Sequence, residues 1–107
     1  MKIELLYFVG CPNQMPALEM LREILDSLSR EDQIHQIEVR TQAEAEAIRF
    51  VGSPSIRING SDIEPWARTA KHFGLSCRTY FDDLHHGSVP SRALLRRAIM
   101  EGIGEGS

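Results

Sequence analysis

The sequence predicts a single α/β domain, with a mixed sheet of about four strands flanked by helices. Three observations predict this class: a nearly continuous apolar run close to the start, an amphipathic segment directly after it, and short alternating segments further on. A chain of 107 residues is long enough to bury one hydrophobic core. We expect the domain to span residues 1–101 and residues 102–107 to form a flexible C-terminal tail.

The first part of the chain is predicted to alternate strands with helices. Residues 2–9 are mostly apolar and are followed by Gly10, which is typical of a central strand buried on both faces. Apolar residues recur with a period of about 3.6 over residues 12–28, which predicts the first helix. Residues 36–40 alternate polar and apolar side chains, as in a short strand with one buried face.

A second helix is predicted after residue 40. Thr41 and Glu44 match a capping box, in which the two side chains bind the first free amides of a helix. We expect this helix to continue through Val51 and to stop at Gly52.

The second half is predicted to contain a hairpin, an edge strand and a last helix. Residues 55–58 alternate again, and Asn59-Gly60 behind them is a strong signal for a tight hairpin turn. Residues 61–76 are interpreted as a loop with a short helical turn. Residues 77–81 are expected to form a final edge strand, and Pro90 suits the first turn of an amphipathic helix.

Composition excludes several classes of function. The formal net charge is −3 and the basic residues are scattered, so we expect no nucleic-acid partner. The N-terminal apolar run contains Glu4 and is too short for a signal or membrane segment, so we expect a cytoplasmic protein without a membrane partner. His85 and His86 are adjacent and would point in opposite directions on an extended segment. We therefore expect neither a metal site nor a cofactor.

Cys11 is the candidate nucleophile. It follows a buried strand and precedes Pro12 and the first helix, so its sulfur is expected at a helix N-terminus. Free backbone amides and the helix dipole at such a position favour the thiolate, which is the nucleophilic form of a thiol. The alternative is that Cys11 is a small buried residue at a tight turn.

Two motifs resemble those of the thioredoxin/glutaredoxin superfamily: Cys11-Pro12-Asn13-Gln14 after the first strand, and Gly52-Ser53-Pro54 before a later one. The resemblance covers most of the chain. It implies a thioredoxin-like fold with Cys11 as the catalytic nucleophile, facing a cis peptide bond between Ser53 and Pro54. Together with the later Cys-Arg-x-Tyr, the motifs are similar to those of a group of small bacterial thioredoxin-like proteins.

The resemblance also implies a substrate-binding edge formed by Pro12, Ser53 and Pro54. In the superfamily, the backbone of the residue before the cis-proline, here Ser53, pairs with an extended substrate segment. The alternative for Gly52-Ser53-Pro54 is an ordinary loop between a helix and a strand, which would be an equally good interpretation if Cys11 were absent.

Gln14 stands where dithiol members of the superfamily carry a second cysteine. Three routes therefore stay open: a monothiol cycle completed by glutathione or another small thiol, resolution by Cys77, or no redox turnover. We expect Cys77 to be a packed structural cysteine at the end of the sheet away from Cys11. A position close to Cys11, within the distance that a disulfide needs, is the alternative.

The leading functional hypothesis is a thiol redox protein that carries out monothiol-type exchange through Cys11, with a protein or a small-molecule thiol as partner. One alternative is a non-catalytic peptide-binding adaptor, and another is a protein that handles soft metals of the mercury type, so whether the chain is an enzyme stays open.

The expected partner follows from the cations available near the cysteine. A glutathione site usually needs cationic side chains near the cysteine, which hold the carboxylates of the tripeptide. The segments beside Cys11 and Pro54 offer only Arg57, and the sequence predicts no position for Arg49 or Arg68. We therefore expect a protein or peptide thiol, captured by main-chain pairing at Ser53.

Overall fold

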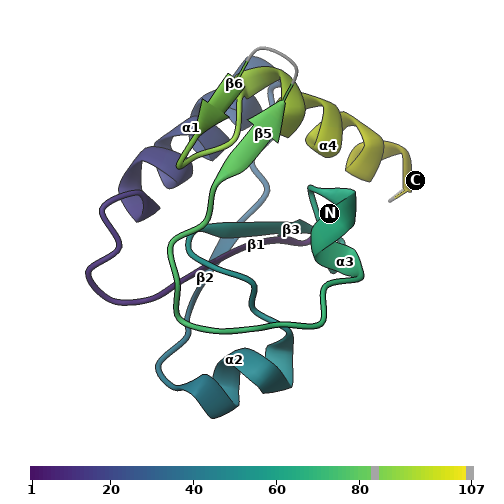
Figure 1. Ribbon diagram of the computed structural model, residues 1–107. Coiled ribbons are helices and arrows are strands. Elements are labelled where there is room, and N and C mark those ends of the chain that lie inside the picture. Colours follow the sequence, from purple (N-terminus) through teal and green to yellow (C-terminus); the bar gives the residue numbers. More distant parts are fainter. Residues whose placement is uncertain (83–84, 106–107) are drawn as a thin grey trace.

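A mixed four-stranded sheet forms the centre of the molecule (Figure 1). The computed structural model describes residues 1–82 and 85–105 of the chain. The strands of the sheet are β1 (Ile3–Tyr7), β2 (Ile34–Glu38), β3 (Ser55–Ile58) and β4 (Ser61–Asp62). They lie in the order β2-β1-β3-β4, with β1 parallel to β2 and antiparallel to β3. The predicted mixed sheet, with the first strand inside it, is confirmed.

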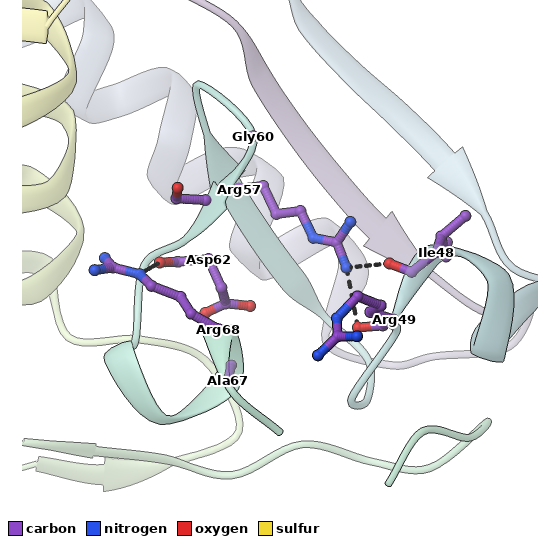
Figure 2. A pocket seen from close by; sticks show the side chains of 8 residues that line it. Ile48, Arg49, Arg57, Gly60, Asp62, Ala67 and Arg68 are labelled. Carbon is purple, nitrogen blue, oxygen red and sulfur yellow. Dashed lines mark hydrogen bonds between the residues drawn. The ribbon is translucent and has the colours of Figure 1, made fainter. Parts of the chain in front are cut away.

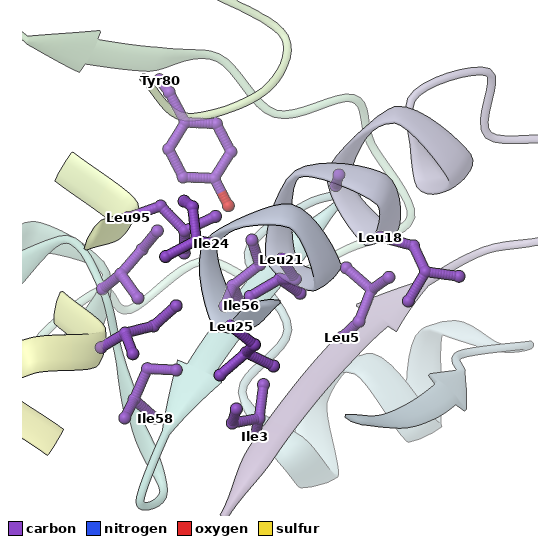
Figure 3. Packing of buried hydrophobic residues seen from close by; sticks show 13 residues of the cluster. Ile3, Leu5, Leu18, Leu21, Ile24, Leu25, Ile56, Ile58, Tyr80 and Leu95 are labelled. Carbon is purple, nitrogen blue, oxygen red and sulfur yellow. The ribbon is translucent and has the colours of Figure 1, made fainter. Parts of the chain in front are cut away.

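Helices cover both faces of this sheet. They are α1 (Gln14–Ser27), α2 (Gln42–Ile48), α3 (Pro65–Arg68) and α4 (Arg92–Glu105). Figure 1 shows α1 and α4 on one face and α2 on the other. The larger core lies on the first face, where Leu21 of α1 and Leu95 of α4 are buried together with Ile56 of β3 (Figure 3). Because side chains alternate along β1, Leu5 enters this core while Leu6 joins a smaller cluster beside α2.

The second helix is capped as predicted but ends earlier. The Thr41 side chain accepts a hydrogen bond from the Glu44 N–H at 3.1 Å, which confirms that half of the capping box. The Glu44 carboxylate instead accepts from the Arg40 N–H at 2.8 Å. The prediction that the helix continues through Val51 is wrong, because Arg49 takes a left-handed conformation with φ 60° and closes α2 after Ile48.

The hairpin after β3 has the predicted turn. Asn59 and Gly60 both have positive φ, 52° and 85°, as a two-residue turn that follows the twist of its strands requires. The second strand, in contrast, begins at Ile34, ahead of its predicted start at residue 36.

The predicted edge strand at residues 77–81 is not part of the main sheet. The strand in this region, β5 (Tyr80–Asp82), pairs with β6 (His85–Gly87) in a separate two-stranded sheet. Cys77 lies before it and forms an isolated bridge elsewhere. In the described part of the chain, no helix is both long and apolar enough to cross a membrane.

The C-terminal helix extends beyond its predicted end. Because α4 runs to Glu105, residues 102–105 are helical rather than part of the predicted tail, and residues 106–107 lie outside the described residues. Gly102 explains the difference. It is buried, its carbonyl accepts a hydrogen bond from Asn59 Nδ2 at 3.1 Å, and an added Cβ would overlap Ile58 Cγ2. Tertiary packing at Gly102 therefore keeps residues 102–105 helical, although their glycine content predicted a flexible tail.

Candidate functional site

Cys11 lies in a tight connection between β1 and α1. Its N–H donates to the Phe8 carbonyl at 3.2 Å, and Gly10 has a φ of 89°, so residues 8–11 form a turn. Its carbonyl accepts from the Gln14 N–H at 3.4 Å, at the first residue of α1. We call residues 8–11 the Cys11 turn. Cys11 is 8% exposed, so it is both a buried residue at a turn and a neighbour of a helix start.

The amino end of α1 carries no charge of its own that would oppose an anion. The helix has no acidic residue in its first turn, and the Asn13 side chain at its N-cap makes no capping hydrogen bond. The positive end of the helix dipole is therefore not neutralised by the side chains of the helix itself. The Gln14 side chain is directed toward β2, where its amide donates to Gln36 Oε1 at 3.1 Å.

The peptide bond between Ser53 and Pro54 is cis, as predicted. The loop that contains it contacts the Cys11 turn directly, since the Phe8 N–H donates to Ser53 Oγ at 3.4 Å. Ser55 pairs with Leu6 near the carboxyl end of β1, so Ser53 and Cys11 lie at the same end of the sheet. Both Ser53 and Pro54 are buried, whereas Pro12 is exposed.

The second cysteine, Cys77, lies beside Ser53 at the same end of the sheet. We call residues 76–78 the Cys77 strap. The Ser53 N–H donates to the Ser76 carbonyl at 2.8 Å, and the Arg78 N–H donates to the Ser53 carbonyl at 3.0 Å. These bonds place Cys77 opposite Ser53 in an isolated parallel bridge, and Cys77 is exposed.

Two expectations about this region are therefore wrong. Cys77 is not a packed residue at the far end of the sheet, because the chain returns after α3 and pairs with Ser53. The expected main-chain pairing of a peptide with Ser53 is also wrong, because the N–H and the carbonyl of Ser53 are both hydrogen-bonded within the chain. The Cys77 strap occupies the position that a substrate strand was expected to take.

Arg78 anchors the strap in a buried cluster of charges. Its two terminal nitrogens donate to the two carboxylate oxygens of Asp62, each at 2.7 Å. One of them also donates to Glu64 at 3.0 Å and the other to Ser55 Oγ at 3.0 Å. The Arg78 side chain is 1% exposed, and its guanidinium lies 4.3 Å from the centre of the Tyr80 ring. Fork-shaped pairing of this kind is among the strongest ionic contacts in proteins.

The charge state of this cluster is set by burial and by these contacts. Burial disfavours the guanidinium, but the hydrogen bonds and charges of Asp62 and Glu64 outweigh it and raise the pKa of Arg78 above its usual value. Burial also raises the pKa of the Tyr80 phenol, which donates to the Pro54 carbonyl at 2.7 Å. The arginine therefore stays charged and the phenol stays protonated at neutral pH.

The sequence assigned no role to Asp62, Glu64 or Arg78, although Arg78 belongs to the Cys-Arg-x-Tyr motif. The available signal was weak: two carboxylates flank Ile63 in a segment interpreted as a loop, and an arginine follows Cys77 directly. Charged residues in such a segment are ordinarily assigned to the solvent-exposed surface.

An open hollow of about 460 Å³ lies beside the two cysteine segments. Its lining residues are Phe8, Val9, Val39, Arg40 and Leu75. Val9, which is 74% exposed, is two residues before Cys11, and Leu75, which is 40% exposed, is two residues before Cys77. Among the described residues, the lining of this hollow is therefore mainly apolar, Arg40 is its one charged residue, and neither cysteine is among the lining residues.

A different pocket, of about 260 Å³, gathers the three arginines considered for glutathione (Figure 2). Arg57 donates to the carbonyls of Ile48 and Arg49 at the end of α2, at 2.6 and 3.1 Å. Arg68 donates to the Asp62 carbonyl at 2.7 Å. The pocket includes the hairpin at Gly60, at the other end of β3 from Ser53, and no residue of the Cys11 turn lines it. Its arginines are not gathered around Cys11.

Comparisons with known proteins give no match: no family model, no curated protein and no solved structure matches the chain.

Proposed function

We propose that the chain is a thioredoxin-like protein that exchanges thiols and disulfides, with Cys11 as the nucleophile. One observation carries the proposal: the Cys11 turn and the cis Ser53-Pro54 bond meet at one end of the sheet, joined by the hydrogen bond from Phe8 to Ser53 Oγ. A cysteine before a helix, opposite a cis-proline, is the arrangement that the sequence motifs imply.

The chemical step is a displacement at sulfur. The Cys11 thiolate attacks one sulfur of a substrate disulfide, a bond forms between Cys11 and that sulfur, and the other half leaves as a thiolate that takes up a proton. The amino end of α1 favours a negative charge nearby, and no acidic side chain in its first turn opposes it. The protein holds a mixed disulfide after this step.

The substrate that fits this surface does not add a strand to the sheet. Strand addition at Ser53 would require the Cys77 strap to leave, and the strap is bonded on both sides of Cys77. The apolar hollow beside Val9 and Leu75 remains open and has the size of a small-ligand site. We therefore assign to the substrate a disulfide with an apolar group next to the reacting sulfur.

The test of the proposal is the rate at which Cys11 exchanges with small disulfides. Wild type and Cys11→Ser should be compared in the reduction of bis(2-hydroxyethyl) disulfide by dithiothreitol, with circular dichroism to verify that both are folded. The Cys11→Ser variant should lose at least nine tenths of the catalysed rate. Equal rates for the two proteins would rule out Cys11 as the nucleophile and with it the proposed function.

The assigned substrate class needs a separate measurement. Benzyl and 2-sulfonatoethyl methanethiosulfonate form mixed disulfides with cysteine and differ in the group they attach. Each rate at Cys11 should be divided by the rate with free cysteine, using Cys77→Ser so that one thiol reacts. We expect this ratio to be higher for the benzyl reagent, and Leu75→Asp should remove the preference. A higher ratio for the anionic reagent would contradict the assigned class while leaving Cys11 as the nucleophile.

A further inference from the structure

We infer that Cys77 is the resolving thiol of Cys11, so that the oxidised protein carries a disulfide between these two residues. The inference rests on the proposed function, because it concerns the second step of the same exchange. It selects one of the three routes that the replacement of a second cysteine by Gln14 leaves open.

Ser53 brings the two cysteine segments together. Its hydroxyl contacts the Cys11 turn through the Phe8 N–H, and its backbone pairs with the strap on both sides of Cys77. Residues paired across neighbouring strands lie about 4.7–4.9 Å apart, so Cys77 lies one strand spacing from Ser53. A disulfide further requires the Cα atoms of Cys11 and Cys77 to come within about 7 Å of each other. Ser53 therefore contacts both the Cys11 turn and the Cys77 strap, and it holds Cys77 next to the turn.

The strap is held firmly in this position. On one side of Ser53, an added Cβ at Gly52 would come within 3.0 Å of Arg78 Cβ, so the strap packs closely on the loop. On the other side, Tyr80 donates to the Pro54 carbonyl. The Arg78 cluster completes the attachment, because the buried arginine finds its carboxylate partners only when the strap lies here.

Holding a thiol in place raises its effective concentration against a nearby disulfide. A small thiol from solution must find the mixed disulfide on Cys11, which is only 8% exposed. Cys77 is exposed and already lies beside this loop, because its two neighbours, Ser76 and Arg78, are hydrogen-bonded to Ser53. Resolution from within the chain is therefore favoured over resolution by a small thiol.

The resolving step balances as a second displacement. The Cys77 thiolate attacks the Cys11 sulfur of the mixed disulfide, the bond from Cys11 to the substrate sulfur breaks, and the substrate half leaves as a thiolate. It takes up the proton that Cys77 released. A dithiol reductant, such as dithiothreitol, then returns both cysteines to thiols in two exchanges and leaves as its own disulfide.

The experiment treats the reduced full-length protein with bis(2-hydroxyethyl) disulfide and follows intact mass and the linked peptides. Wild type should pass to the Cys11–Cys77 disulfide, whereas Cys77→Ser should accumulate the mixed disulfide on Cys11 and release it at least tenfold more slowly. Stable mixed disulfide on wild-type Cys11 would overturn the resolving role but leave the proposed function standing. If Cys11 is unmodified in both proteins, the proposed function and this inference both fail.

A second variant tests the role of the strap. Arg78→Lys keeps the charge but loses the fork that binds Asp62, so the internal disulfide should form at least tenfold more slowly while the first reaction at Cys11 keeps its rate. Arg22→Lys, at an exposed position of α1, is the matched control and should change neither step. An unchanged resolving rate in Arg78→Lys would contradict the positioning role of the strap. The comparison of wild type with Cys77→Ser tests the resolving role without perturbing this cluster.

Discussion

A single buried arginine determines where the second cysteine of this protein lies. Arg78 is bonded to Asp62, Glu64 and Ser55, and its charge is removed almost completely from water. Such a group is costly to bury, and it is tolerated because both carboxylates accept from it. The position of neighbouring Cys77 is thus fixed by charge pairing as well as by the backbone.

Removing this arginine should destabilise the fold strongly. Arg78→Met leaves Asp62 and Glu64 buried without a cation, and the free energy of unfolding should fall by about 3–5 kcal/mol. Urea denaturation followed by circular dichroism measures this. Arg22→Met, which changes an exposed arginine, should remain within about 0.5 kcal/mol of wild type. Equal losses in the two variants would contradict the stabilising role of the cluster.

Tyr80 should make stability depend on pH in the alkaline range. Burial raises the pKa of its phenol in the folded protein, whereas in the unfolded chain the pKa is about 10. Below pH 10 both states keep the proton and the contribution is fully present. As the pH rises further, only the unfolded state ionises, so the free energy of unfolding falls by up to about 1.4 kcal/mol per pH unit from this residue.

The comparison variant for this effect is Tyr80→Phe. It loses the hydrogen bond to the Pro54 carbonyl, so it should be less stable at pH 7. Its urea midpoint should decline less between pH 9.5 and 11 than that of wild type. Parallel declines for the two proteins would show that Tyr80 does not carry the pH dependence.

At the scale of elements, α4 contains two glycines in opposite environments. Gly102 faces Ile58 and Met1, whose Sδ would lie 2.9 Å from an added Cβ, whereas an added Cβ at Gly104 meets nothing within 4 Å. The same substitution should therefore have opposite effects at two positions of one helix.

Gly102→Ala should lower the free energy of unfolding by about 1–3 kcal/mol, because the methyl group overpacks a closely fitted contact. Gly104→Ala should raise it by up to about 1 kcal/mol through helix propensity. Thermal unfolding of the two variants under identical conditions provides the measurement. A stabilising Gly102→Ala would mean that the helix end does not pack on β3 as described.

The elements that the sequence predicts well are those with local signals. The turn at Asn59-Gly60 and the cap at Thr41 depend on residues within a few positions, and both occur as predicted. The pairing of Cys77 with Ser53 has no such signal, because it depends on buried charges that look like surface residues in a sequence. The motif around Pro54 thus placed one side of the candidate site, while the residues covering it could be found only in three dimensions.

At the scale of the whole molecule, the proposed disulfide would join the first loop of the chain to its last third. The loop it closes contains roughly 65 residues, which restricts the unfolded chain and should stabilise the oxidised protein by up to about 4 kcal/mol. Urea midpoints of the oxidised and the reduced protein measure this difference. Cys77→Ser, which cannot close the loop, should show no shift with the same oxidant, and an oxidised wild type less stable than the reduced one would indicate a strained link.

The bridge between Ser53 and Cys77 also fixes when the site becomes complete as the chain is synthesised. Cys11 leaves the ribosome first, and at about 5–20 residues per second Cys77 follows roughly 3–13 seconds later. From the emergence of Ser53 until that of Cys77, the nascent chain has one of its two thiols and no cover over the backbone of Ser53. A chain that stops before Ser76 would leave the N–H and the carbonyl of Ser53 unpaired, so truncated products should expose backbone groups that the finished protein covers.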